Sequence, residues 1–355
     1  MTPSSQAETV GVDVGATKIA AVRLTADGTV SARARRATPR RTAVELVAVI
    51  GQLVAEVGGE RVTAVGVGLP GMVDAATGAL VFAPGLDFAR APLRAMIADA
   101  LGLPVVADND ANAAAWAEYR LGAGRGHEHQ VLVTLGTGLG CGVVVAGRLL
   151  RGAHGFAAEA SHLTVDPLGP PCECGKRGCW GVSASGAAIA RLGRQAAAAR
   201  PASLLARLLG DGSRGGGAGA RGAGDAGRAA RDAGGAARDA DGDAQHAGVG
   251  SWDAGEAVTE AARGGDAEAL DILERVGTLT GTGLAALANV FDPAVLIVGG
   301  GPVAAGDLLL APARASFARQ LYSPGDRPAV PVLPAHFGAD AGAIGAALLA
   351  IETTT

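Results

Sequence analysis

The sequence predicts an α/β protein with two domains, and three observations support this prediction. Apolar patterns typical of strands and of helices alternate along the chain. Its 355 residues exceed the size of one ordinary domain. Two segments, Thr9–Leu24 and Gln130–Val145, each have the pattern strand, glycine-rich turn, strand. We therefore expect a duplicated hairpin.

The first half of the chain alternates strands with short helices. In the first hairpin Val10, Val12 and Val14 alternate with smaller or polar residues, and an apolar pattern resumes after the turn. Apolar residues at helical spacing then separate buried strands. The expected elements are a helix over 42–57, a strand Val62–Leu69 ended by Pro70-Gly71, a helix Leu93–Leu101, a strand Pro104–Ala107 and a helix Ala111–Arg120.

The second half contains the second hairpin and several helices. Asp292-Pro293 separates a long helical pattern from a buried strand, and a run of glycines followed by Pro302 ends that strand. The expected elements are strands Gln130–Leu135 and Gly142–Val145, helices Ala254–Gly264 and Ala267–Leu287, a strand Val295–Val298 and a small-residue helix Ala341–Ile351.

Residues 211–250 differ from the rest in composition. Glycine and alanine fill 25 of these 40 positions, and Val249 is the only large aliphatic residue. Such a segment buries too little apolar surface to offset the entropy of ordering it. We predict a disordered Gly/Ala-rich insertion without a functional role.

Charge and hydropathy exclude several classes of protein. The 30 Lys and Arg nearly balance the 34 Asp and Glu, which argues against a nucleic-acid-binding surface and a polybasic membrane anchor. The N-terminus has no signal-peptide pattern. The apolar stretches Val131–Gly147 and Gly281–Gly301 are interrupted by glycines or by Asp292-Pro293, so we expect buried core rather than membrane spans. The predicted location is the cytoplasm.

Two glycine-rich turns are candidates for binding phosphate. In the first, Gly15 permits close approach to the backbone, Thr17 and Lys18 can add donors, and Asp13 can hold Mg²⁺ through water. The second, Leu135–Gly140, is weak by itself. Neither fits a Walker A loop or a dinucleotide fingerprint, and a plain hairpin turn is the alternative for each. Their pairing favours phosphate binding from two sides.

Polar residues gather between the strand Pro104–Ala107 and the next helix. The segment Asp108-Asn109-Asp110-Ala111-Asn112 supplies more polar side chains than helix capping needs. One carboxylate is therefore available as a general base acting on a hydroxyl.

Three cysteines and a histidine have the spacing of a metal site. His162, Cys172, Cys174 and Cys179 form the ligand set of a closed Cys₃His zinc site, with glycines and prolines between them. The alternative is unligated thiols. Because the protein fills all four positions, the zinc would be structural, and it would hold Glu159 in a fixed place.

Eight motifs in this order resemble the ROK family of repressors, open reading frames and sugar kinases, and within it the bacterial zinc-containing glucokinases. They span nearly the whole chain except residues 211–250. The motifs are DVGATK at 13–18, GLPG at 68–71, NDANAAAWAE at 109–118, LGTGLG at 135–140, GxxGxxxExxH at 152–162, CxCGxxGCW at 172–180, GGG at 299–301 and DAGAIGAA at 340–347.

The resemblance implies an actin-like ATPase fold, of the ribonuclease H-like type, with a cleft between two domains. The small α/β domain would comprise residues 1–110 and 340–355, and the large one residues 111–339 with a zinc knuckle at 162–179. The implied activity is ATP- and Mg²⁺-dependent transfer of the γ-phosphoryl group to the 6-hydroxyl of a hexose, in first place glucose. A homo-oligomer, dimer or tetramer, is also implied.

The resemblance assigns roles to individual residues. Asp110 corresponds to the general base, and His162 to a residue that serves both sugar and zinc. Four residues correspond to sugar contacts besides Asp110: Gly71, Asn109, Glu159 and His162. The residues lining the phosphates and the nucleotide are Asp13, Gly15, Thr17, Lys18, Gly136, Thr137, Gly138, Gly299, Gly300 and Gly301.

Three positions depart from the family pattern. Gly181 stands where relatives have a Glu that contacts the anomeric side of the sugar, Ser161 interrupts the E-x-G-H motif, and Gly85 replaces an Asn. We therefore expect weak hexose binding, which Gly181→Glu should tighten. A kinase for another hexose or an N-acetylhexosamine, a sugar-responsive regulator and an inactive scaffold are the alternatives.

Overall fold

The computed structural model describes residues 7–212 and 251–354. Apart from its first two residues, the insertion predicted over 211–250 lies outside the described residues, and so does its predicted disorder. Within the described ranges, no helix is both long enough and apolar enough to span a membrane.

Two five-stranded sheets have equivalent strand orders. In each, a central strand pairs antiparallel with the strand that follows it and parallel with a later one, so the duplicated hairpin is confirmed. The first sheet has the order β3 (Val30–Ala37), β2 (Lys18–Leu24), β1 (Glu8–Val14), β4 (Val62–Leu69), β7 (Val105–Asn109). The second has the order β10 (Arg148–Leu149), β9 (Leu139–Val145), β8 (Gln130–Leu135), β11 (Val295–Gly299), β12 (Val332–Pro334). A small sheet pairs β5 (Met72–Val73) with β6 (Leu80–Phe82).

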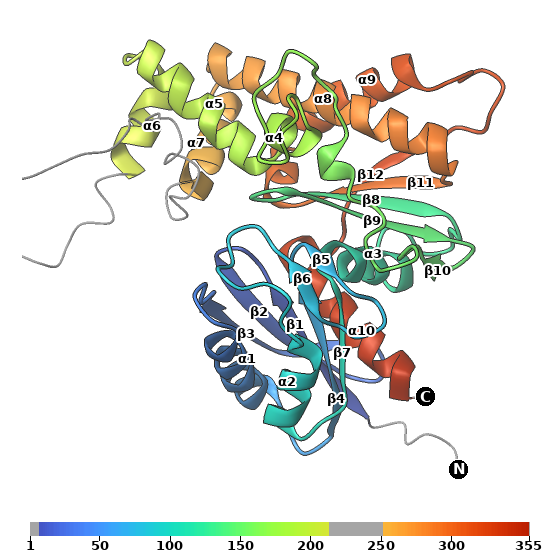
Figure 1. Ribbon diagram of the computed structural model, residues 1–355. Coiled ribbons are helices and arrows are strands. Elements are labelled where there is room, and N and C mark those ends of the chain that lie inside the picture. The colour runs from blue at the N-terminus through green and yellow to red at the C-terminus, as the bar shows by residue number, and fades with distance from the viewer. Residues whose placement is uncertain (1–6, 213–250, 355) are drawn as a thin grey trace, which may run out of the picture.

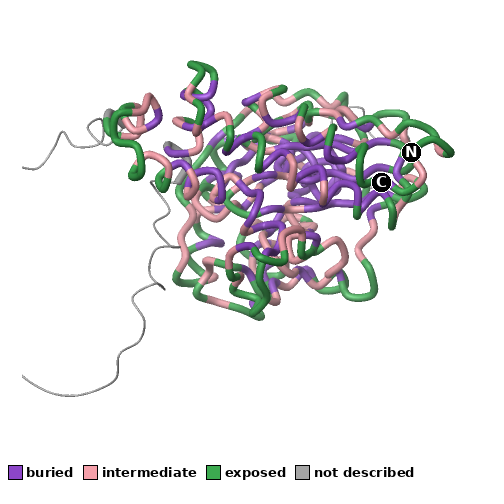
Figure 2. The backbone as a smooth tube through the Cα atoms, turned by 90° about the horizontal axis from the view of Figure 1, so that it is seen from above, coloured by how far each residue is buried: buried purple, intermediate pink, exposed green. Residues whose placement is uncertain are grey.

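Helices form three layers around these sheets (Figure 1). The first sheet carries α1 (Ala43–Val57) and α2 (Leu93–Leu101), and α3 (Asp110–Arg120) packs with α10 (Ala341–Thr354) between the two sheets. The second sheet carries α4 (Trp180–Ala184), α5 (Gly186–Ala199), α6 (Leu204–Gly212), α7 (Ser251–Arg263), α8 (Ala267–Phe291) and α9 (Asp307–Gln320). Buried residues accordingly fill three cores, and Figure 2 shows them concentrated inside the molecule.

Glycines let α10 lie directly on the first sheet. Alternate residues of β1 face opposite sides, so Val10 packs toward α1 while Gly11 faces α10. A Cβ at Gly11 would collide with the carbonyl of Ala343, and one at Gly66 of β4 with the carbonyl of Ala346. The helix therefore contacts the backbone of the sheet itself.

The helix α3 is held in the same way from both sides. A Cβ at Gly345 of α10 would collide with the carbonyl of Ala113, and one at Gly142 of β9 would lie 2.5 Å from the carbonyl of Ala111. Because α3 contacts both β4 and β9, it links the two sheets. The predicted domain division at residues 110 and 340 stays a proposal.

Parallel strands bring the predicted site residues to one edge of each sheet. In the first sheet β1, β4 and β7 run parallel, so Asp13, Gly71 and Asn109 all lie at or beyond carboxyl ends. In the second sheet the carboxyl ends of β8 and β11 lead into Gly136 and Gly300. Ligand sites in open α/β sheets form at such edges.

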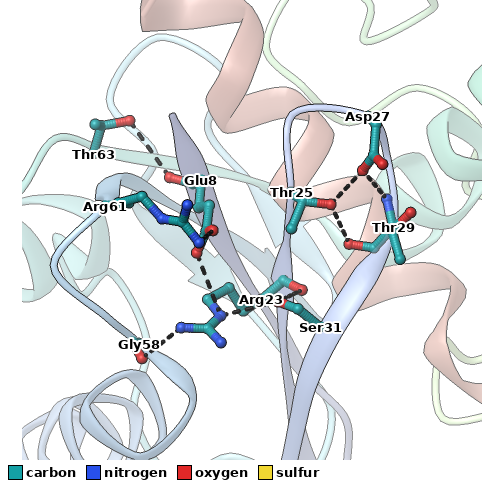
Figure 3. Close-up of polar contacts among 9 residues, drawn as sticks. All are labelled: Glu8, Arg23, Thr25, Asp27, Thr29, Ser31, Gly58, Arg61 and Thr63. Atoms are coloured by element: carbon teal, nitrogen blue, oxygen red, sulfur yellow. Dashed lines mark hydrogen bonds and ion pairs between the residues drawn. The ribbon is translucent and has the colours of Figure 1, made fainter. Parts of the chain in front are cut away.

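Ion pairs lie at the opposite end of the first sheet, where the parallel strands begin (Figure 3). The buried carboxylate of Glu8 lies 2.6 Å from Arg61 and 3.4 Å from Arg23. Arg23 also donates to the carbonyl of Gly58 and to Ser31. The charged side chains of Glu8, Arg23 and Arg61 therefore stabilise this end of the sheet.

Element boundaries differ from the predictions at several places. The second hairpin strand begins at Leu139, because the strand continues through the small residues Gly140 to Gly142. The strand predicted at Pro104–Ala107 runs over Val105–Asn109. Strand β3 was not predicted, because it lies at an edge and exposes most of its side chains, arginines included. The last helix runs to Thr354.

Replacing Gly66 with Ala should destabilise the fold, because the new methyl group would collide with the carbonyl of Ala346. Overpacking of this kind costs roughly 1–3 kcal/mol. Gly51→Ala is the matched control, since a Cβ at this position of α1 meets nothing within 4 Å. It should stabilise by roughly 0.5–1 kcal/mol. Urea unfolding measures both, and equal effects would contradict the packing account.

Candidate active site

Asn109 caps the helix that carries the predicted base. Its Oδ1 accepts from the backbone N–H groups of Ala111 at 2.9 Å and Asn112 at 3.1 Å, while its Nδ2 donates to the carbonyl of Gly71 at 3.0 Å. The helix begins at Asp110, one residue before the predicted start. Capping is thus the task of Asn109, which leaves the carboxylate of Asp110 available for chemistry.

Asp110 lies in an environment that keeps its proton affinity high. Burial raises the pKa of Asp110 to about 7, and the charges of Asp13 and Glu159 also raise it, whereas a hydrogen bond from the N–H of Ala111 opposes the shift. A base with a pKa near neutrality is suited to general-base work at neutral pH.

The two neighbouring carboxylates are also shifted. Burial raises the pKa of Asp13 to about 6, with Lys18 lowering it and Asp340 adding to the rise. Partial burial raises the pKa of Glu159, while His162 lowers it. Asp13 lies against the start of α10, because a Cβ at Gly342 would come within 2.6 Å of its carboxyl carbon. The structure therefore brings Asp13, Asp110 and Glu159 together.

The first glycine-rich turn is held by the segment that follows β3. The N–H of Gly15 donates to the carbonyl of Lys18 at 3.0 Å, and its carbonyl accepts from the hydroxyl of Thr38 at 2.7 Å. The N–H of Thr38 donates to Thr17, and Arg40 donates to Ala16. The N–H of Gly15 is thus engaged within the turn.

The second turn has the same internal bond and an additional neighbour. The N–H of Gly136 donates to the carbonyl of Gly138 at 2.8 Å, and Thr137 and Gly138 are exposed. The N–H of Gly186, the first residue of α5, donates to the carbonyl of Gly136 at 2.8 Å. The positive end of α5 is therefore beside this turn. Ser185, whose side chain caps α5, is the sequence signal for it.

The third glycine motif packs against the end of β8. Gly300 has a φ of +95°, and a Cβ there would collide with the carbonyl of Leu135. Gly299 ends β11, and Gly301 begins the short 3₁₀ helix η3 (Gly301–Ala305). Gly300 is thus needed for the close approach of two strand ends.

The predicted metal ligands converge. The nitrogen or sulfur atoms of His162, Cys172, Cys174 and Cys179 all lie within 4.8 Å of one another. Cys172 Sγ is 3.7 Å from His162 Nδ1, and Cys174 Sγ is 3.5 Å from Cys179 Sγ. Ligands of a tetrahedral zinc, each about 2.3 Å from the ion if sulfur, stand about 3.8 Å apart. The cluster fits zinc in ligand type and in spacing.

Comparison with known proteins places the chain in a family. The model described as the ROK family matches residues 9–221 and 240–353. The chain belongs to the ROK family. A glucokinase from Streptomyces coelicolor is 37% identical over 345 residues, which is 97% of this chain and 98% of the relative.

Two solved ROK structures share the fold. The ROK family glucokinase from Streptomyces griseus, in complex with glucose and AMPPNP, is 41% identical, with a TM-score of 0.81, covering 97% of this chain and 99% of that one. The ROK hexokinase from Thermus thermophilus is 31% identical, with a TM-score of 0.66, covering 98% and 99%. The predicted actin-like α/β class is confirmed.

Gly181 and Ser161, two of the three positions at which the sequence departs from the expected motifs, lie next to each other. Gly181 is buried in the helix α4, and the hydroxyl of Ser161 occupies the place of a Cβ on residue 181. The expectation that Gly181→Glu tightens sugar binding stays a prediction, and the added side chain would require the Ser161 hydroxyl to rotate away. The two positions are therefore direct neighbours in the structure.

Glu118, at the other end of α3, is a structural residue for which no role was predicted. Its buried carboxylate accepts from the N–H groups of Ala123, His336 and Phe337, at 2.8 to 2.9 Å. It thereby ties α3 to the segment that leads into α10. A buried glutamate in an alanine-rich helix was the available signal.

Asp110→Asn should raise stability at pH 8 and change it little near pH 4. In the folded protein Asp110 keeps its proton up to about pH 7, whereas in the unfolded chain the carboxyl group loses its proton near pH ~3.9. The folded state thus binds more protons between these values, and stability falls as pH rises through them. Thermal unfolding across this range measures the difference.

Asp74→Asn is the control of opposite sign. Hydrogen bonds from the hydroxyl and N–H of Thr77 hold the pKa of Asp74 below its usual value. Its contribution to stability is present at neutral pH and lost in acid. A stabilising Asp74→Asn together with a neutral Asp110→Asn at pH 8 would contradict the assigned environments.

Proposed function

We propose that this protein is an ATP-dependent hexose kinase that transfers the γ-phosphoryl group to the 6-hydroxyl of glucose. The observation that carries the proposal is Asp110, an available carboxylate with a pKa near neutrality beside Asn109 and Glu159. The glucose and AMPPNP bound to the similar Streptomyces griseus enzyme support both substrates.

Asp110 would accept the proton of the 6-hydroxyl as its oxygen attacks the γ-phosphorus, while the bond from that phosphorus to the bridging oxygen breaks and ADP leaves. Asn109 uses one amide hydrogen on Gly71 and can offer the other to a sugar hydroxyl. Glu159 and His162 would bind further hydroxyls. No covalent enzyme intermediate is needed, because positioning and charge neutralisation supply the catalysis.

The two glycine-rich turns would hold the nucleotide phosphates between them. Asp13 offers a carboxylate for Mg²⁺, which when bound neutralises phosphate charge. Thr17, Lys18, Thr137 and Gly138 would donate to phosphate oxygens, and Gly299 to Gly301 would line the nucleotide.

Replacing Asp110 with Asn should lower kcat by at least ~10²-fold, the usual scale for loss of a general base. The KM for ATP should change little, because Asp110 contacts the sugar. In the unchanged protein kcat/KM for glucose should rise with pH up to about 7 and then level off, since the carboxylate must be unprotonated. Near-normal turnover by the variant would remove Asp110 as the base.

We also propose that His162, Cys172, Cys174 and Cys179 bind one structural zinc ion. The ion would fix the start of α4 and the short helix η1 (Ala160–His162), which directly follows Glu159. A reducing, cytoplasmic setting follows from the proposal, because the thiols must remain unoxidised.

Cys172→Ser should remove zinc, lower the melting temperature and weaken sugar binding, since η1 loses its anchor. Cys141→Ser is the matched control, because Cys141 is buried but lies outside the cluster. It should retain one zinc ion per chain. Metal analysis with thermal unfolding tests this, and a metal-free parent of full activity would end the zinc proposal.

A kinase for another hexose or an N-acetylhexosamine is the second candidate. It is supported by Gly181 beside Ser161, because no carboxylate is available at position 181 to bind the anomeric side of glucose. The resemblance to the ROK family implies a glutamate at position 181, where this chain has a buried glycine beside Ser161. Assays with ATP and a panel of sugars separate the two candidates. Turnover of none would favour a regulator or an inactive scaffold. A homo-oligomer remains a proposal for light scattering to test.

Gly181→Glu alone should tighten glucose binding less than the same change made together with Ser161→Gly, because its side chain must first displace the Ser161 hydroxyl. The double variant Ser161→Gly, Gly181→Glu should bind glucose more tightly than the parent, by roughly 10- to 150-fold if the carboxylate accepts one or two sugar hydrogen bonds. Ser161→Gly alone is the control and should have a small effect. Additive effects of the two changes would show that the positions are independent.

A further inference from the structure

We propose that the ion pair between Asp108 and Arg151 is a positioning device for sugar binding. It joins the strand that leads into Asn109 and Asp110 to the loop that carries Glu159. The inference rests on the proposed function, since it concerns the same substrate site. Arg151 was not singled out by the sequence motifs.

Asp108 is the last residue but one of β7 and is 8% exposed. Its Oδ1 accepts from the N–H of Asn109 at 2.8 Å and from Nδ2 of Asn112 at 3.0 Å. Its Oδ2 accepts from Nε of Arg151 at 2.7 Å. Both oxygens are therefore engaged, so Asp108 is unsuited to be the base and suited to fix the backbone that presents Asn109 and Asp110.

Arg151 is the second residue of the loop between β10 and η1, which comprises residues 150–159 and is called the crossing loop here. The carbonyl of Arg151 accepts from the N–H of Ala157 at 3.1 Å, which closes the base of the loop two residues before Glu159. Arg151 therefore contacts Asp108 through its guanidinium and Ala157 through its carbonyl, and so connects the end of β7 to the part of the loop that precedes Glu159.

The crossing loop also rests on the small sheet of the first half. The carbonyl of His154 accepts from the N–H of Ala75 at 3.1 Å. Gly155 has a φ of +98°, and a Cβ there would collide with the carbonyl of Val73. The loop starts from the second sheet, crosses to the first half at two points and returns to Glu159.

This route gives the ion pair a role beyond stability. Glu159 comes from the crossing loop and Asn109 from β7, so the two reach one sugar only if loop and strand keep their register. A misplacement of about 1 Å in such a constellation can cost ~10²-fold. The Asp108–Arg151 pair is a direct ionic link between the two parts, and removing Arg151 would leave a buried carboxylate with one charge partner fewer.

The test compares Arg151→Ala, Arg151→Lys and Asp108→Asn with the parent. Arg151→Ala should raise the KM for glucose at least ~10-fold while the KM for ATP stays within about twofold, because the phosphate turns lie elsewhere. Arg151→Lys should recover part of the loss. Asp108→Asn combined with Arg151→Ala should be no worse than the poorer single variant. Calorimetric titration with glucose, without nucleotide, should give the same order of affinities.

Arg148→Ala is the control, an exposed arginine three residues earlier in the same hairpin, and it should leave both KM values unchanged. Equal rises in the KM for glucose and for ATP, or parent-like glucose affinity in Arg151→Ala, would overturn the inference. Arg151→Lys keeps the charge and decides the matter should Arg151→Ala fail to fold. Absence of turnover in a parent that still binds glucose would count against the proposed function, while the affinity ratios would still decide the role of the pair.

Discussion

The rest of the structure depends on direct backbone-to-backbone contacts around α3 and α10, which are possible because glycines stand at the points of contact. Gly11 and Gly66 let α10 lie on the first sheet, Gly345 lets it touch α3, and Gly142 lets α3 touch the second sheet. A single methyl group at any of these positions would separate two layers. The third core between the sheets is accordingly rich in alanine, since larger residues would not fit the spacing.

The same close packing produces the chemistry. The N-terminus of α3 lies between the two sheets, so the half-buried carboxylate of Asp110 is partly desolvated and its pKa is raised by burial and by the charges of Asp13 and Glu159. A buried carboxylate with a raised pKa reduces stability at neutral pH, and the packing of α3 compensates for it. Asn109 caps the start of this helix, and the hydrogen bonds to Glu118 fix its other end. The Asp108–Arg151 pair fixes the strand that leads into it.

Local patterns in the sequence predicted much of this arrangement. Alternating valines identified β1, helical spacing identified α1, and the spacing of His162, Cys172, Cys174 and Cys179 predicted that these four side chains converge. Contacts between distant residues could not be predicted in this way. The pairing of Asp108 with Arg151 joins residues 43 positions apart, and the obstruction of Gly181 by Ser161 depends on how η1 packs on α4. The strand β3 was missed because an exposed edge strand has no buried face along most of its length.

The position of α10 has a consequence for how the chain folds. The hydroxyl of Thr9 donates to the carbonyl of Ala347, so the strand β1 contacts a helix that follows it 338 positions later in the chain. Until α10 leaves the ribosome, the face of the first sheet that carries Gly11 and Gly66 has no partner. Contacts of such high sequence separation slow folding and prolong the life of incomplete intermediates. The first sheet therefore gains the helix that covers this face only after residues 341–354 have been synthesised, and a chain cut short before α10 would leave the face exposed in a partly folded, aggregation-prone state.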